Sequence, residues 1–168
     1  MKKWIPVLIL SLLCPFLPAT EFGSEKDGYT LNLSGEWKSG TFLTRLIGQG
    51  STRLTAFKDL SGKTPLVAHL LSMETFGDLA FNRQATCDAL ANDPETVGGV
   101  RNTTVKIGGL DAARLEYRRS GKTIIQYLLV VNGRLWSLMF VGPGKMTAAQ
   151  LKAIDTDAAS LRIRTKTQ

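Results

Sequence analysis

Apolar and polar residues alternate along several short segments in the first half of the chain. In residues 29–33 every second side chain is apolar, which predicts a strand with one buried face. Residues 42–47 and 53–57 are two further strand candidates, and the glycine-containing segment between them predicts a hairpin. The continuous apolar run 66–71 predicts a buried strand, with a buried helix as the alternative that periodicity alone leaves open.

The pattern changes to that of a helix at Thr75. Thr75 stands three residues before Asp78, a spacing similar to a capping box, and the Asn-Asp-Pro sequence at 92–94 ends the predicted helix. Cys87 falls on the apolar face, which favours a small core residue over a reactive thiol. The residues expected along that face are Phe76, Leu79, Ala80, Cys87, Leu90 and Ala91.

The second half of the chain predicts an antiparallel meander of four strands. Asn132 and Gly133 stand between two apolar runs, and both residues tolerate the positive φ that a type I′ hairpin turn requires. Glycine pairs or Ser-Gly separate the other strands. The predicted strands are 103–107, 112–117, 123–131 and 135–141.

A C-terminal helix completes the predicted fold. Thr147 and Gln150 have capping-box spacing. The order of elements predicts an α+β fold, an antiparallel sheet meander packed against helices. The apolar face of the last helix is expected to contain Leu151, Ile154, Ala158 and Leu161.

The N-terminus has the features of an export signal. Lys2 and Lys3 precede an apolar run that ends at the small residue Ala19, with two prolines near its end. A membrane-spanning helix would need about 20 uninterrupted apolar residues, so a cleaved signal peptide is the favoured interpretation. Acylation at Cys14 is the alternative, and Leu13 before it stands where a small residue is needed.

These features predict the domain organisation and the location of the protein. We expect an exported protein, in a bacterial periplasm or outside the cell, or associated with the outer envelope, with no transmembrane span after signal cleavage. The predicted segments are a signal peptide at 1–19, a linker at 20–27, a single α+β domain at 28–164 and a tail at 165–168.

Composition narrows the range of functions. The 168 residues are 43% hydrophobic, which fits one globular domain and excludes a disordered chain. Lys and Arg number 21 against 14 Asp and Glu, so the domain stays basic after loss of Lys2 and Lys3. The chain has 1 His and 2 Cys, which excludes a cysteine-based metal cluster or a disulfide scaffold. No metal or cofactor site is predicted.

Two stretches resemble a known family. Residues 28–37, Gly-Tyr-Thr-Leu-Asn-Leu-Ser-Gly-Glu-Trp, and residues 105–117, a strand followed by Gly-Gly and another strand, are similar to PsbP-like proteins. That superfamily includes the DcrB-like bacterial lipoproteins and secreted proteins. The resemblance covers about residues 28–163 and implies an α/β/α sandwich acting as a non-catalytic accessory or binding module. It carries no catalytic residue over to this chain.

His69 and Cys87 are the only candidates for nucleophilic catalysis. Together with Asp78 or Asp88 they would supply the residue types of a triad, but nothing in their spacing favours one. His69 lies within the apolar run 66–71, which favours a core position. We therefore expect no enzymatic activity, and a thiol hydrolase remains the alternative.

Basic residues gather around one predicted hairpin of the meander. They would form an anion-binding face for an acidic protein, envelope lipid headgroups or polysaccharide. The alternative is a solvated sheet face, since Glu116 lies among the arginines. Nucleic acid is not an expected partner, because no recognition motif is present. The candidate residues are Lys106, Arg114, Arg118, Arg119, Lys122 and Arg134.

The function expected from these features is that of an exported, non-enzymatic accessory protein that binds a protein partner. The partner itself is not identified by the sequence. An envelope anion- or lipid-binding module that uses the basic hairpin is the second hypothesis.

Overall fold

The computed structural model describes residues 18–40, 51–60 and 63–165. Most of the predicted signal peptide, including Cys14, the strand candidate at 42–47 and most of the tail lie outside the described residues, and these assignments stay predictions. In chain order the elements are β1 Ala19–Ser24, β2 Tyr29–Ser34, β3 Lys38–Ser39, β4 Ser51–Leu60, β5 Lys63–Glu74, α1 Leu79–Ala91, β6 Thr96–Ile107, β7 Leu110–Arg119, β8 Lys122–Val131, β9 Arg134–Gly142, α2 Ala148–Ala159 and β10 Arg162–Ile163.

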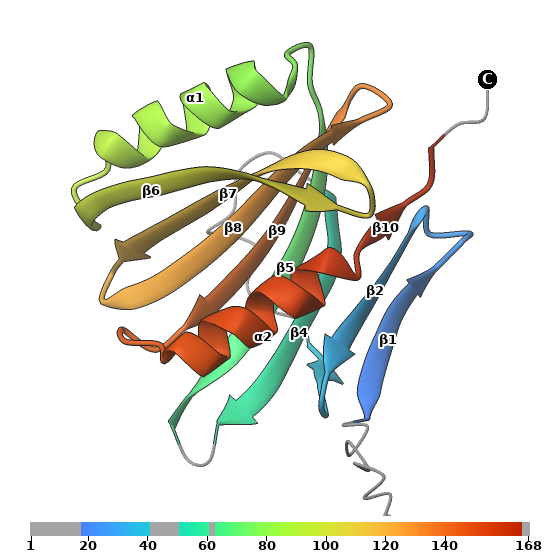
Figure 1. The fold of residues 1–168 in the computed structure, drawn as a ribbon, viewed down its shortest axis with the longest axis horizontal. Helices are drawn as coiled ribbons and strands as arrows, with labels where there is room; N and C mark the ends of the chain where they lie inside the picture. Colours follow the sequence, from blue (N-terminus) through green and yellow to red (C-terminus); the bar gives the residue numbers. More distant parts are fainter. Residues whose placement is uncertain (1–17, 41–50, 61–62, 166–168) are drawn as a thin grey trace, which may run out of the picture.

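A seven-stranded antiparallel sheet in the order β3-β4-β5-β9-β8-β7-β6 forms the centre of the molecule. One face, here called the α2 face, is covered by α2 and the small sheet β1-β2-β10. The opposite α1 face packs against α1 where the sheet consists of β6, β7 and β8 (Figure 1). The expected α+β sandwich is thus confirmed.

The main core lies between the large sheet and the α2 layer. Leu70, Leu138 and Phe140 of the sheet are fully buried there against Leu31 of β2 and Ile154 of α2. A smaller cluster under α1 contains alternate residues of β7 and β8, with partly buried side chains of the helix packed on it. The period of two along the strands therefore supplies one core on each face of the same sheet.

The predicted meander and its hairpin turn are confirmed. Strands β6 to β9 pair in sequence order, each antiparallel to the next. Asn132 and Gly133 have φ values of 52° and 69°, the left-handed conformation that a type I′ turn needs at both central positions. The apolar run 66–71 lies within strand β5, so the helix alternative is wrong.

Two segments differ from the expected organisation. The linker expected at 20–27 is wrong in part, because Ala19–Ser24 forms β1 and pairs along the whole of β2. Only Phe22 of this edge strand is buried, so its sequence lacks the alternation of apolar and polar residues that predicts a strand. Strand β6 begins at Thr96, seven residues before the expected strand. Gly98 and Gly99 have φ values of 77° and 76° where the pairing of β6 with β7 shifts register. Two glycines in a row read as the end of a strand in the sequence, so the first part of β6 was not predicted.

Helix α1 starts later than the sequence predicted. Its N-cap is Asp78, whose Oδ1 accepts a hydrogen bond of 2.8 Å from the Phe81 backbone N–H. Thr75 lies outside the helix, and Phe76, expected on the buried face, is fully exposed. The buried residue of this helix is Asn82. Cys87 is half-buried against the smaller core, and the expected helix end at Asn92 is confirmed.

Helix α2 agrees with its prediction. The reciprocal Thr147–Gln150 capping box is formed, with bonds of 2.8 and 3.2 Å. Ile154 and Ala158 are buried in the main core. Asp157 is buried as well, and its Oδ1 accepts hydrogen bonds from the backbone N–H and the hydroxyl of Ser34. These bonds attach α2 to β2.

Candidate functional site

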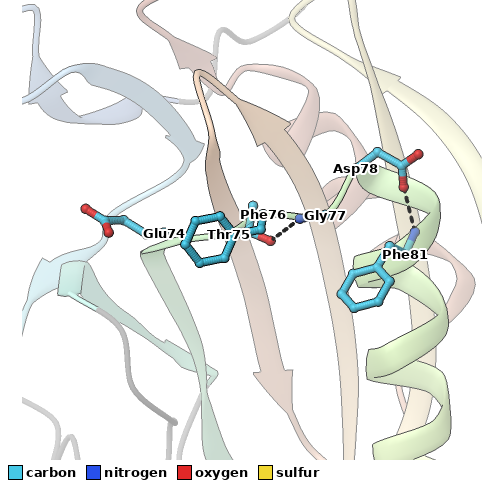
Figure 2. A pocket seen from close by; sticks show the side chains of 6 residues that line it. All are labelled: Glu74, Thr75, Phe76, Gly77, Asp78 and Phe81. Carbon is cyan, nitrogen blue, oxygen red and sulfur yellow. Dashed lines mark hydrogen bonds between the residues drawn. The ribbon is translucent and has the colours of Figure 1, made fainter.

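Two exposed phenylalanine side chains stand together where β5 passes into α1. The exposed fraction is 108% for Phe76 and 64% for Phe81, while most other large apolar side chains of the described residues are buried. Phe76 projects from the connecting segment and Phe81 from the first turn of α1, as Figure 2 shows. Both line a shallow hollow of about 760 Å³ with Glu74 and Asp78. We call Phe76 and Phe81 the aromatic pair.

Hydrogen bonds hold the segment that carries Phe76. The backbone N–H of Thr75 donates to the carbonyl of Gly133 at 3.0 Å. The Thr75 hydroxyl accepts from the N–H of Gly77 at 3.2 Å, drawn in Figure 2, and donates to Asn82. The buried Asn82 amide in turn donates to the carbonyls of Gly77 and Asp78. Phe76 is therefore presented to solvent by a turn with satisfied polar groups.

The glycine at position 77 sets the place of the Phe81 ring. A Cβ atom at Gly77 would lie 2.2 Å from Cδ1 of Phe81. Only a residue without a side chain lets the ring lie against the backbone at this point. The aromatic pair therefore depends on local backbone structure on both sides of the helix start.

A second hollow adjoins the first and has a cationic lining. It has a volume of about 800 Å³ and shares Glu74, Thr75 and Phe76 with the hollow of the aromatic pair. We call it the arginine groove. Its other lining residues are Asp27, Gly28, Arg53, Asn132, Gly133, Arg134, Trp136 and Arg164.

Arg53 and Arg134 converge on one hydroxyl in this groove. Nε of Arg53 donates to Oγ of Ser72 at 3.1 Å, and Nε and one Nη of Arg134 donate to the same oxygen at 3.3 and 3.1 Å. Ser72 has no exposed surface, so the shared acceptor fixes both guanidinium groups from below. The Arg53 guanidinium carbon also lies 5.9 Å from the ring centre of Trp136, within range of a cation–π interaction.

Positive charge exceeds negative charge in the lining of the groove. The carboxylate of Glu74 lies 3.7 Å from Arg134, and its side chain is 84% exposed. Within residues 18–40, 51–60 and 63–165, no carboxylate lies within ion-pair distance of Arg53 or Arg164. The lining contains three arginines against Asp27 and Glu74. An excess of positive charge remains.

The basic residues predicted from the sequence do not form one patch. Strand alternation places Arg114 and Arg118 on the α2 face and Arg119 on the α1 face. Arg119 pairs with Asp93 at 2.6 Å and Glu95 at 3.5 Å, and Lys106 pairs with Asp111 at 2.8 Å. Arg118 and Lys122 are exposed, and no ion pair joins either to a described residue. Anion binding by this set stays a prediction.

Arg114 is bound within the molecule. Its guanidinium pairs with Glu116 at 2.9 Å and Asp155 at 2.8 Å, and only 12% of its side chain is exposed. Burial acts to lower the pKa of Arg114, but the hydrogen bonds to the two carboxylates raise it above its ordinary value. The hydroxyl of Tyr127 donates to Asp155 as well. This cluster links β7 and β8 to α2, which accounts for Arg114 without a ligand.

His69 and Cys87 are not brought together. Nδ1 of His69 lies 3.1 Å from the Thr55 hydroxyl, and burial lowers the pKa of His69. The Cys87 sulfur accepts from the Asn102 amide of β6 at 3.7 Å, and burial raises the pKa of its thiol. The strand of Asn102, β6, is four positions from the strand of His69, β5, in the sheet, so these two strands are roughly 19 Å apart. The two side chains do not form a nucleophile–base pair.

The described residues contain neither a metal-binding cluster nor a membrane-spanning helix. Among them no group of three His, Cys, Asp or Glu side chains could hold a metal ion. In the same part of the chain no helix has the length and apolar content needed to cross a membrane.

The aromatic pair and most of the arginine groove were not predicted from the sequence. Phe81 lies off the apolar face of the helix, and this was the one available signal that it is exposed. Arg134 was a candidate, but Arg53 was not, because 81 positions separate them in the chain. Only the strand order β4-β5-β9 places them on either side of Ser72.

Comparison with known proteins identifies the fold. No family model matches the sequence, and no curated protein matches it either. The structure is similar to cyanobacterial PsbP (CyanoP) from Synechocystis sp. PCC 6803, with a TM-score of 0.57 and 13% identity over 88% of this chain and 94% of that one.

Two further solved structures are similar. LpqN of Mycobacterium tuberculosis, described as involved in cell envelope biogenesis, has a TM-score of 0.59 and 16% identity over 87% of this chain and 90% of its own. A protein from Bacteroides thetaiotaomicron VPI-5482 has a TM-score of 0.52 and 15% identity over 88% of this chain and 49% of its own. The resemblance expected from residues 28–37 and 105–117 is thus confirmed for the fold: the chain adopts the PsbP-like α+β fold.

Proposed function

We propose that this protein is an exported, non-enzymatic accessory protein of the cell envelope that binds a protein partner through the aromatic pair. The full exposure of Phe76 on a hydrogen-bonded turn is the observation that carries the proposal. The basic, apolar N-terminus and the fold shared with LpqN, a protein involved in cell envelope biogenesis, support the location.

The physical basis is the free energy available from burying two aromatic rings. Large exposed aromatic side chains are typical anchors of protein interfaces, where each contributes apolar area at a small cost in conformational entropy. Because the segment at Phe76 is held by Thr75 and Asn82, little backbone freedom would be lost on binding. Glu74 and Asp78 at the edges of the hollow favour a partner with basic groups around an apolar centre.

The test is capture of the partner from envelope extracts with matched variants. The double substitution Phe76→Ser with Phe81→Ser removes both rings, and Val97→Ser removes another exposed apolar side chain, 52% exposed on β6. We expect a protein retained by the wild type and by Val97→Ser to be lost with the double variant. A partner retained equally by all three variants would show that the aromatic pair is not the binding surface.

A further inference from the structure

We propose that the arginine groove is a binding site for a phosphate group, held by Arg53 and Arg134 above Ser72 and Trp136. This site is separate from the aromatic pair in its chemistry and does not require a protein partner. Its donors come from β4 and β9, with β5 between them. Arg164, after β10, brings a third cation to the lining.

The two guanidinium groups of the site are preorganised by one buried acceptor. Ser72 is completely buried, and its hydroxyl oxygen accepts hydrogen bonds from the guanidinium groups of both Arg53 and Arg134. The two guanidinium groups are therefore fixed relative to each other before any ligand binds. A guanidinium has five N–H donors in a plane. Arg53 uses Nε for Ser72, and no described group accepts from its Nη atoms. These donors remain available at the open side of the groove.

The balance of charge in the groove favours an added anion. Two guanidinium groups that share one acceptor atom repel each other and favour an anion between or above them. The carboxylate of Glu74 lies 3.7 Å from Arg134, beyond hydrogen-bonding distance, and is largely solvated. It is therefore a weak internal counter-ion that an incoming phosphate would displace.

The residues beneath the two arginines are neutral. Trp136 is only 5% exposed and lies beneath Arg53. Its ring and the neutral Ser72 hydroxyl lie under the two guanidinium groups, and neither carries a negative charge. Planar, charge-assisted donors in such a setting suit phosphate, whose several oxygens can accept from both arginines at once.

Inorganic phosphate, titrated into the folded protein, is the first probe. Two-dimensional NMR of the arginine Nε–H and tryptophan indole N–H groups should show Arg53, Arg134 and Trp136 shifting together. We expect Arg53→Gln and Arg134→Gln each to weaken binding about tenfold or more. Glu74→Gln should strengthen binding severalfold, because the competing carboxylate is removed.

Lys122→Gln is the matched control for net charge. Lys122 is exposed and stands at the far end of β8 from the groove, roughly 30 Å away. Its substitution should leave phosphate binding unchanged. Equal weakening by Lys122→Gln and Arg53→Gln, or no saturable shift at Trp136, would overturn the proposal. Arg53 is exposed, so its variant is expected to fold even if Arg134→Gln does not.

Vesicles distinguish the sources of the phosphate group. Flotation with phosphatidylglycerol vesicles that is lost in Arg53→Gln, with no flotation on phosphatidylcholine vesicles, would identify a lipid headgroup. Saturable inorganic phosphate binding without flotation would identify a soluble phosphate ester. Failure of both probes refutes this site and leaves the proposed protein interface, which uses Phe76 and Phe81, untouched.

Discussion

Substitution of Asp157 should destabilise the protein by separating α2 from β2. The Asp157 side chain is 5% exposed, and its Oδ1 accepts 3.0 Å and 2.6 Å hydrogen bonds from the backbone N–H and the hydroxyl of Ser34. Hydrogen bonds to a charged group each contribute about 1.5–3 kcal/mol. In Asp157→Ala both are lost, and water reaches the half-buried Ser34 groups in their place. We therefore expect the free energy of unfolding to fall by about 3 kcal/mol.

Thermal and urea denaturation followed by circular dichroism measure this effect. For a domain of this size a loss of about 3 kcal/mol corresponds to a decrease in Tm of roughly 6–12 °C. Asp157→Asn keeps an acceptor oxygen of the same shape and should lose about half as much. Lys152→Ala, at an exposed position of the same helix, should change stability by less than about 0.5 kcal/mol.

A double-mutant cycle isolates the bond between the two side chains. Ser34→Ala removes the hydroxyl donor but keeps the backbone N–H, so Asp157→Ala and Ser34→Ala should show a coupling energy of about 1–2 kcal/mol. A loss below about 0.5 kcal/mol in Asp157→Ala would refute the assignment of this carboxylate as the attachment of α2.

Three further predictions concern the core, the helix start and pH. Leu138→Ala, at a position with 0% exposure in the main core, should cost about 2–5 kcal/mol in urea denaturation. Asp78→Ala removes the N-cap of α1 and should cost about 0.5–2 kcal/mol, with faster amide hydrogen exchange at Phe81 as the local measure. Burial raises the pKa of Tyr117 to about 12 from its ordinary 10.0. The folded state favours the neutral phenol, so this contribution to stability is complete below pH 10.0 and is lost as the pH rises toward about 12. Ultraviolet titration of the wild type against Tyr117→Phe measures it, and a phenol that ionises at its ordinary pKa would contradict the burial.

Much of the local structure was predictable because its causes are local. Alternation along the meander follows from the opposite directions of successive side chains in a strand. The type I′ turn follows from the tolerance of Asn132 and Gly133 for positive φ, and the α2 start from the Thr147–Gln150 capping box. The start of α1 was placed wrongly because Thr75 and Asp78 are both suitable caps. In the structure Asp78 caps the helix, and the Thr75 hydroxyl bonds to Gly77 and Asn82 instead.

The sequence alone determined the α+β class, the meander and the fold resemblance, since each depends on periodicity and turn chemistry within short segments. The tertiary structure decided which polar residues lie together. It paired Arg114 with Asp155 across two elements and placed Arg53 beside Arg134 over Ser72. The order of strands in the sheet determines these distances, and strand order depends on burial of the whole core. For that reason Lys106, Arg114 and Arg119 of the expected basic hairpin lie in separate ion pairs. The excess of positive charge described above lies instead in a groove between strands that are distant in the sequence.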